Sequence, residues 1–452
     1  MSWVDVLLPE GGDGDPCLTM GRTVDRQEFR TRIDERRREL AAAGVGERST
    51  VALRLPPSAA GIELLLAAWA LDAQVVLLDV RLAPAELALA LERLEPQFLV
   101  EADRAPGGSL RGFHEVTPVV TARTGRPAGT DHVLLQLSSG STGPSKVIGR
   151  SAASLLEEVE RYTRIADFPG PGSRMVVLAS LVHVLGLVGG ILHSLHRGIE
   201  IVVPARMTLD GIRAAIAADA RPTTVLGAPV QAQLLASVRD PAPLPHFRGM
   251  ITGGDAVPDA LWESFTRTYG ATLGTMYGMT ETGVIATDVA GTHRPRLTPA
   301  PGMGIEIVDD QILVATPASP YLGATVPGRW ADGLLRTKDA GALDPDSNLL
   351  TVHGRLDSQV SVGGLKVDLL EVEQTLAGLP GVDSAVVVFD RDITAYVALS
   401  DPAVRQGLDA ALATALAAYK RPRALHVLPE LPRTSTGKPL RDPVALSAAA
   451  GR

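Results

Sequence analysis

The sequence predicts an α/β protein with two parts, a large N-terminal portion built on parallel sheets and a small α+β domain at the C-terminus. Up to residue 301, short β-branched runs alternate with longer amphipathic runs, which is typical of βαβ units. Between residues 302 and 352 the helical runs stop, and short strands with Gly and Pro turns predict a small β-rich subdomain. From residue 354 a new set of strands and helices begins.

The first βα units are expected near the N-terminus. Strands are predicted at residues 51–55, 75–78 and near Phe98, with helices at 62–71 and 85–94 between them. A further strand at 132–137 leads directly into a loop rich in Gly and Ser. Later strands, each next to a helical pattern, are predicted at residues 175–178, 201–203, 223–226, 250–252 and 272–276.

The C-terminal elements predict a compact domain of their own. Residues 386–389 and 393–399 are expected to pair as a hairpin, followed by a helix at 408–418 and a strand at 424–428. We therefore divide the chain into residues 1–353 and 354–452.

Composition and charge exclude several classes of protein. Hydrophobic residues make up 45% of the chain and charged residues 21%, which excludes a disordered chain. The net charge of −8 argues against a nucleic-acid partner, which would usually require a basic patch. Cys17 is the single cysteine, so an internal disulfide and a multi-cysteine metal site are excluded. The acidic, Gly/Pro-broken start is unlike a signal peptide, so we expect a cytoplasmic protein.

One uncharged run, residues 175–192, is about as long as a membrane-spanning helix. It contains Ser180, His183 and three glycines, and no Trp or Tyr lies at either edge to anchor it at an interface. We expect a buried strand, a turn and a buried helix, and no membrane partner.

The strongest local motif is LSSGSTGPSKV, residues 137–147. Backbone N–H groups and hydroxyls of such a loop can bind an oligophosphate, and Lys146 can neutralise its charge. The loop residues in question are Ser139, Gly140, Ser141, Thr142 and Gly143. The P-loop GxxxxGK[ST] is excluded, because Ser145 replaces its second glycine and Val147 replaces its Mg²⁺-binding Ser or Thr. A Ser/Gly-rich surface turn is the alternative for this segment alone.

Six further motifs follow along the chain. They are GGDAVP at 253–258, YGMTETG at 277–283, RTKDAG at 336–341, GRLDSQVSVGG at 354–364, EVE at 371–373 and RTSTGKPLR at 433–441. Together with the Gly/Ser loop, their order and spacing resemble the family of acyl-CoA synthetases, adenylation domains and luciferases, from about residue 51 to residue 440. The resemblance implies that ATP activates a carboxylic acid as its acyl-AMP, with release of pyrophosphate. A thiol would then take the acyl group, either from CoA or from the phosphopantetheine arm of a separate carrier protein.

The resemblance also assigns nucleotide-binding roles. Tyr277 would stack on adenine, and the backbone of Gly253, Gly254 and Asp255 would flank the base, with Gly278 and Met279 in the same motif as Tyr277. Thr280 would offer its hydroxyl to the α-phosphate, and Glu281 would bind Mg²⁺. Asp339 would accept hydrogen bonds from the ribose hydroxyls, and Arg355 would reach the ribose or a phosphate.

Residues 354–452 would be mobile in such an enzyme, and residues 1–353 would bind ATP and the acid. Lys438 corresponds to the lysine that bridges the substrate carboxylate and the AMP oxygens, where a fixed cation stabilises developing charge. Asp357 matches the hinge about which the small domain rotates between the two steps. Gly364, with Gly363, would border the pantetheine channel, where a missing Cβ permits close approach.

The acid is expected to bind near His183, at which CoA ligases of this family often carry a histidine. Met279 would line the same pocket. Relatives that activate amino acids usually place an aspartate here to pair with the α-amine, and ASLVHVLGL, residues 179–187, contains none. We therefore expect an aryl or other non-α-amino carboxylic acid.

Each of these residues has an alternative interpretation when it is considered alone. Glu281 and Asp339 could be solvated loop acids, Lys438 a tail lysine, and Tyr277 and His183 core residues. The sequence also departs from the family pattern, with Ser145 for a proline, Lys338 for a glycine and Ser361 for a lysine. Three other functions therefore stay open: an amide synthetase or another use of the adenylate, a catalytically silent nucleotide-binding protein, and a phosphotransferase.

Overall fold

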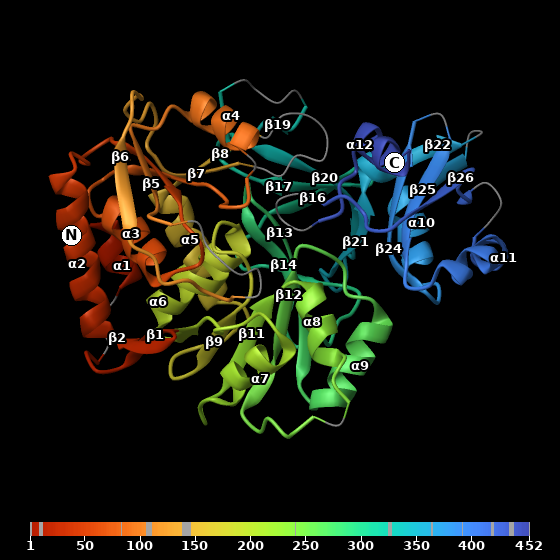
Figure 1. The fold of residues 1–452 in the computed structure, drawn as a ribbon, viewed down its shortest axis with the longest axis horizontal. Coiled ribbons are helices and arrows are strands. Elements are labelled where there is room, and N and C mark those ends of the chain that lie inside the picture. Colours follow the sequence, from red (N-terminus) through yellow and green to blue (C-terminus); the bar gives the residue numbers. More distant parts are fainter. Residues whose placement is uncertain are drawn as a thin grey trace.

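The computed structural model describes residues 2–451, except for 9–11, 83, 105–110, 138–145, 240, 324–327, 363–364, 391, 417–419 and 434–437. Two large sheets and a small β-rich sheet form the N-terminal portion, and the C-terminal elements form a separate body at the opposite end of the molecule from the N-terminus (Figure 1). The predicted α/β class and its β-rich and α+β parts are confirmed.

The first large sheet has seven strands in the order β18-β8-β7-β4-β3-β5-β6. Its parallel centre contains the predicted strands, and antiparallel β6, β8 and β18 lie toward the edges. The strands are β3 (Thr50–Arg54), β4 (Gln74–Leu77), β5 (Phe98–Ala102), β6 (Pro118–Ala122), β7 (His132–Leu137), β8 (Val147–Ser151) and β18 (Tyr321–Leu322). The helices α3 (Ala59–Trp69) and α4 (Pro84–Leu94) connect the first of these strands.

The second large sheet has nine strands in the order β15-β14-β13-β12-β11-β9-β10-β1-β2. Its strands are β1 (Pro16–Met20), β2 (Arg22–Asp25), β9 (Arg174–Val177), β10 (Glu200–Val202), β11 (Thr223–Gly227), β12 (Phe247–Gly253), β13 (Thr272–Met279), β14 (Gly283–Asp288) and β15 (Thr298–Pro299). The helices between its strands are α6 (His193–Arg197), α7 (Leu209–Ala217), α8 (Pro229–Ala236) and α9 (Asp259–Tyr269). Helix α5 (Ala152–Thr163) contacts β7 and β8 of the first sheet as well as α6. Strand β1 pairs with β10 on one side and with β2 on the other, so the N-terminal pair β1–β2 completes a sheet whose remaining strands begin at residue 174.

The expected helix after β9 is present, but residues Leu185–Leu192 form a π-helix, η1. A π-helix is wider than an α-helix, and glycines let it pack closely. A Cβ on Gly186 would overlap the carbonyl oxygen of Ser180, and one on Gly189 would lie 2.9 Å from the ring of Tyr162. Among the residues that the structure describes, no helix has the length and apolar character needed to cross a membrane.

The small β-rich sheet has the order β16-β17-β20-β19, with β21 paired to β20. Its strands are β16 (Ile305–Val308), β17 (Gln311–Ala315), β19 (Trp330–Ala331), β20 (Leu334–Leu343) and β21 (Leu350–Arg355). The β20–β21 ladder places Arg355 opposite Asp339, so it continues past the division drawn from sequence at residues 353/354. That division stays a prediction.

The C-terminal body contains the predicted hairpin, in which Val386 lies opposite Tyr396. Its third strand runs parallel to the second, with α10 and α11 packed over the same apolar core. The elements are η2 (Leu356–Ser358), β22 (Gln359–Val362), β23 (Leu365–Asp368), α10 (Leu369–Ala377), β24 (Val382–Phe389), β25 (Ile393–Leu399), η3 (Pro402–Val404), α11 (Arg405–Ala415), β26 (Ala424–Leu428) and α12 (Pro443–Ala450).

Candidate active site

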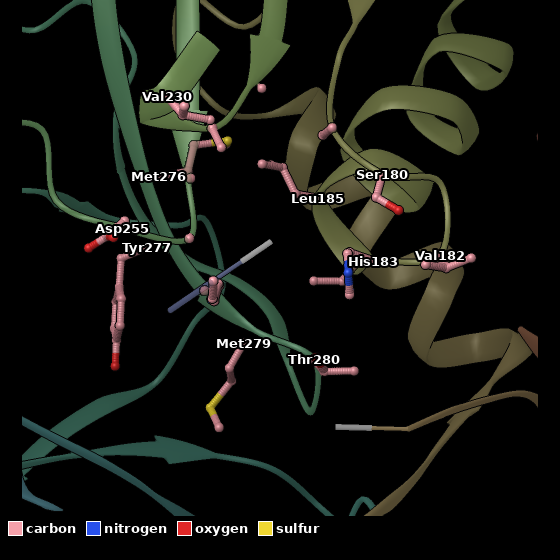
Figure 2. A pocket seen from close by; sticks show the side chains of 18 of the residues that line it. Ser180, Val182, His183, Leu185, Val230, Asp255, Met276, Tyr277, Met279 and Thr280 are labelled. Atoms are coloured by element: carbon pink, nitrogen blue, oxygen red, sulfur yellow. The ribbon is translucent and has the colours of Figure 1, made fainter. Parts of the chain in front are cut away.

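One cavity of about 2130 Å³ is lined by loops of both large sheets and by the C-terminal body. It brings together most of the residues singled out from sequence: Lys146, His183, Gly253, Gly254, Asp255, Tyr277, Gly278, Met279, Thr280, Glu281, Asp339 and Lys438. Figure 2 shows His183, Tyr277, Met279 and Thr280 around the same open space. Other predicted site residues, Ser139, Gly140, Ser141, Thr142, Gly143 and Gly364, lie outside the described residues, as do the side chains of Arg355 and Asp357.

Tyr277 and Asp339 meet at one side of the cavity although they lie on different sheets. The Tyr277 hydroxyl donates a hydrogen bond to Oδ2 of Asp339 at 2.5 Å. The Asp339 backbone N–H donates to the buried Thr337 hydroxyl at 3.0 Å, which fixes this part of β20. An aromatic face therefore lies beside a carboxylate, as a nucleoside with a flat base and ribose hydroxyls requires.

Thr280 and Glu281 lie at the tip of the hairpin formed by β13 and β14. Met279 pairs with Gly283 across the hairpin, and three residues form the turn between them. Gly283 has a φ of +77°, a left-handed conformation that closes a three-residue hairpin loop and favours glycine. The TETG sequence therefore holds the side chains of Thr280 and Glu281 at the end of paired strands.

Two residues that the sequence analysis missed bind Glu281. The Tyr321 hydroxyl donates to Oε1 of Glu281 at 2.8 Å, and the Arg329 guanidinium lies 3.7 Å from the same oxygen. Arg329 also donates to the Tyr321 hydroxyl at 3.2 Å. Burial, together with the charge of Glu281, raises the pKa of Tyr321 to about 12, so its hydroxyl stays a neutral donor. Lys146 lies over the Tyr321 ring, 5.7 Å from its centroid, which is within cation–π range.

Glu281 could hold a divalent cation only together with oxygen atoms of a bound nucleotide or of water. The described partners approach Oε1 of Glu281, which leaves Oε2 for a metal. Within the described part of the chain, no group of three or more His, Cys, Asp or Glu side chains could hold a metal ion. Mg²⁺ at this position would therefore take its other ligands from phosphate oxygens and water, as Mg²⁺ does at nucleotide sites.

His183 lies on the opposite side of the cavity, after β9. Burial lowers the pKa of His183, Lys438 and Arg81 lower it further and Asp79 opposes them, so the imidazole is neutral near pH 7. Its Nε2 is buried and has no hydrogen-bond partner among the described residues. Gln136 donates to the carbonyl oxygen of Val182 at 2.8 Å and thus fixes the loop that carries His183. Lys438 of the C-terminal body lines the same cavity as His183.

The walls beyond His183 are apolar. Leu185, Val230 and Met276 lie around this part of the cavity in Figure 2. Gly253 lies at the same wall, where a Cβ would come within 3.0 Å of Leu185. The described side chains from residues 179 to 187 include no acid.

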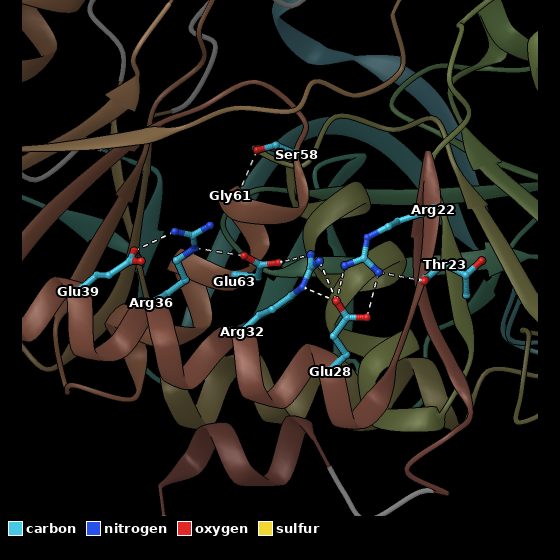
Figure 3. A network of polar contacts seen from close by, with 9 residues as sticks. All are labelled: Arg22, Thr23, Glu28, Arg32, Arg36, Glu39, Ser58, Gly61 and Glu63. Carbon is cyan, nitrogen blue, oxygen red and sulfur yellow. Dashed lines mark hydrogen bonds and ion pairs between the residues drawn. The ribbon is translucent and has the colours of Figure 1, made fainter.

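Helix α3 lines another part of the cavity through Ile62 and Leu65, and an ion-pair network fixes its position. Glu63 on α3 is 2% exposed, with Arg32 and Arg36 of α2 (Arg26–Ala42) at 3.3 and 3.2 Å. Figure 3 shows how this network continues along α2 to the edge strand β2. Because a buried carboxylate needs such partners, α3 is held in one position against α2.

Comparison with known proteins points to one family. A family model described as "AMP-binding enzyme" matches residues 12–320, and one described as "AMP-binding enzyme C-terminal domain" matches residues 371–438. The chain is 25% identical to 3-hydroxybenzoate–CoA/4-hydroxybenzoate–CoA ligase of Thauera aromatica, over 94% of this chain and 92% of that protein. It is 32% identical to probable 2-succinylbenzoate–CoA ligase of Mycobacterium tuberculosis, over 70% of this chain and 84% of that protein.

Solved structures share the whole fold. O-succinylbenzoate coenzyme A synthetase from Bacillus subtilis, in complex with AMP, superposes with a TM-score of 0.83 at 22% identity and covers 98% of both chains. Anthranilate CoA ligase, in complex with anthranoyl-AMP, gives a TM-score of 0.82 at 21% identity, over 100% of this chain and 97% of that one.

Proposed function

Because this chain belongs to the family of AMP-binding enzymes, we propose that it is an AMP-forming ligase that joins an aryl or other non-α-amino carboxylic acid to CoA. One observation carries this proposal: Lys438 of the C-terminal segment lines the same cavity as Thr280 and Glu281 of the N-terminal portion. The hydroxybenzoate–CoA and succinylbenzoate–CoA ligases among the relatives support CoA as the acceptor. A separate carrier protein is the alternative source of the thiol.

The first step joins the acid to the α-phosphorus of ATP. A carboxylate oxygen attacks that phosphorus, the bond to the bridging oxygen breaks, and pyrophosphate leaves with the electron pair. Tyr277 and Asp339 hold the base and the ribose, and Thr280 donates its hydroxyl to the α-phosphate. Lys438 provides a fixed positive charge where negative charge develops on the α-phosphoryl oxygens. Mg²⁺ held by Glu281 and the phosphates would supply further positive charge.

The apolar wall of Leu185, Val230 and Met276 supports an aromatic or other apolar acid. An α-amino group placed there would be a buried cation, and the described residues 179–187 offer it no carboxylate partner. His183, neutral at pH 7, lines the same cavity, and its buried Nε2 has no hydrogen-bond partner among the described residues.

In the second step the thiol sulfur attacks the acyl carbon, and the bond between that carbon and the AMP oxygen breaks. Rotation of residues 354–452 about Asp357 would remove Lys438 and bring Gly364 to the thiol channel. ATP and CoA as substrates suit a cytoplasmic protein.

The experiment is ATP–pyrophosphate exchange with a panel of aryl, short-chain and α-amino acids, followed by addition of CoA. We expect exchange with aryl acids, and AMP with acyl-CoA as products. If none of the acids supports exchange, the result would instead favour a silent nucleotide-binding protein. ADP as the product would support a phosphotransferase. Exchange without thioester formation would support another use of the adenylate.

A further inference from the structure

We propose that the ion pair between Arg441 and Glu373 positions Lys438 in the cavity, which makes both partners positioning residues for adenylation. This inference rests on the proposed function, because it assigns Lys438 to the first of the two steps.

The pair has the geometry of a structural clamp. Arg441 donates through Nη1 to Oε2 of Glu373 at 2.9 Å and through Nη2 to Oε1 at 2.6 Å. The Val387 backbone N–H donates to Oε2 of the same carboxylate at 3.0 Å. Glu373 is 8% exposed and the side chain of Arg441 is 34% exposed, so the largely buried carboxylate accepts three charge-assisted hydrogen bonds. A bidentate pair of this kind fixes the orientation of the arginine as well as its distance.

The clamp acts on the base of the loop that carries Lys438. The Leu440 backbone N–H donates to the carbonyl oxygen of Pro432 at 2.7 Å, and Arg433 forms a bridge with Pro439. These contacts close the base of the loop, and Leu431 just before it packs with Leu428 and Leu446 in the domain core. Arg441, three residues after Lys438, ties the base of the loop to Glu373 on α10, and α10 packs on the domain core.

The clamp also lies on the face that closes the cavity. Leu369 and Gln374 of α10 and Phe389 of β24 line the cavity together with Lys438 and Arg441. Burial raises the pKa of Glu373, Arg441 opposes this, and the negative charge of Asp255 adds to it. Arg441 lines the same cavity as Asp255 of the large N-terminal portion, so the clamp lies at the junction of the two parts. With the clamp in place, the position of α10 sets the position of Lys438 over the α-phosphate.

The consequence is specific to one half-reaction. Loss of the clamp frees the loop, so Lys438 meets the developing charge for only a fraction of the time. Because the thiol step does not use Lys438, it should not depend on the clamp. A pair that merely stabilised the C-terminal domain would affect both steps alike.

The test compares Glu373→Gln, Arg441→Met and the double variant with Lys438→Ala. The control is Arg423→Met, which removes an exposed arginine that pairs with Asp392 at 2.9 Å in the same domain. Pyrophosphate exchange measures the first step, and thioester formation from synthetic acyl-AMP and CoA measures the second. Amide hydrogen exchange at Leu440, together with thermal melting, reports on the loop without requiring activity.

We expect Lys438→Ala to lose about 10²–10³-fold in the first step, the usual effect of removing one preorganised charge. Both clamp variants should lose at least about 10-fold in that step and stay within about twofold of the unaltered protein in the second. Arg441→Lys keeps the charge but cannot form the bidentate contact of the guanidinium, so it should give an intermediate rate. The double variant should recover the melting temperature without recovering the first step. Hydrogen exchange at Leu440 should be faster in the clamp variants and unchanged in Arg423→Met.

Equal slowing of both steps, or full recovery of the first step in the double variant, would overturn the proposal. Unchanged hydrogen exchange at Leu440 in the clamp variants would overturn it as well, whatever the enzyme activates. Failure of the proposed function gives a different result, because no acid of the panel then supports pyrophosphate exchange by the unaltered protein. Hydrogen exchange at Leu440 still tests whether the Arg441–Glu373 pair fixes the loop.

Discussion

Replacing Arg150 with methionine should destabilise the protein and loosen the turn that carries Thr280 and Glu281. Arg150 on β8 donates to Glu158 on α5 at 2.7 Å, and the two side chains are 4% and 0% exposed. Burial raises the pKa of Glu158, and Arg150 opposes this shift. Glu158 in turn accepts the Val284 backbone N–H at 3.3 Å, and a Cβ on Gly283 would overlap its carboxyl group. The Arg150–Glu158 pair therefore supports the β13–β14 hairpin through Val284 and Gly283, next to the turn that carries Thr280 and Glu281.

The magnitude follows from burial. Removing one partner of a buried ion pair costs about 3–5 kcal/mol, because the other charge is left without compensation. At about 2–4 °C per kcal/mol, Arg150→Met should lower the melting temperature by about 6–20 °C. The double variant Arg150→Met/Glu158→Gln removes both charges of this pair, and Gln can still accept the Val284 N–H. Replacing a buried pair by neutral groups of similar size is often close to neutral, so most of the stability should return.

The assay is thermal and denaturant unfolding of the single variants Arg150→Met and Glu158→Gln and of the double variant, read as a double-mutant cycle. A coupling energy of about 2 kcal/mol or more is expected for two residues in direct contact. If the effects of the two single changes simply add in the double variant, the pair does not act as a unit. The support assigned to it beneath the Thr280–Glu281 turn would then be wrong.

Three further changes test other parts of the structure. Glu281→Gln keeps the shape of the side chain but loses its charge, so adenylation should slow and rising Mg²⁺ should restore part of the rate; a normal rate at limiting Mg²⁺ would remove Glu281 from the metal site. Lys338 has a φ of +66°, a left-handed conformation that glycine adopts more easily than alanine. The free energy of unfolding should therefore be about 1 kcal/mol higher for the Lys338→Gly variant than for Lys338→Ala, and equal values would contradict this backbone conformation. In the folded protein, burial lowers the pKa of His193 from 6.5 to about 3. Below pH 6.5 the unfolded chain therefore binds a proton that the folded protein does not bind, which favours the unfolded chain. Between pH 7 and pH 5 this residue should cost about 2 kcal/mol of stability, and His193→Phe should remove that part of the pH dependence.

The fold was largely predictable from sequence because its strands and helices have strong periodic patterns. The strand predicted at 424–428 is β26 (Ala424–Leu428), and the predicted hairpin of β24 and β25 is present. Local patterns do not report long-range pairing, so the addition of β1 to the second large sheet beside β10 was not predicted. The π-helix was also missed, because it depends on close packing of Gly186 and Gly189 against Ser180 and Tyr162 rather than on any periodicity of its own.

The candidate site was predictable where a motif carries it. Tyr277, Asp339 and Lys438 belong to recognisable motifs, and the structure places all three at one cavity. Tyr321 and Arg329 belong to no motif. Tyr321 reaches Glu281 from the edge strand β18, where it pairs with Ile148 of β8, and Arg329 contacts both residues. The roles of all these residues in the reaction stay predictions until the variants are measured.

The most direct test of the central claim follows an oxygen atom. The acid is supplied with ¹⁸O in both carboxylate positions, with ATP and CoA, and the products of one turnover are analysed by mass spectrometry. Attack of the carboxylate on the α-phosphorus, followed by thiol attack on the acyl carbon, predicts AMP that carries one ¹⁸O atom, with unlabelled pyrophosphate. An ¹⁸O atom in orthophosphate, with ADP as the nucleotide product, would contradict an acyl-AMP intermediate.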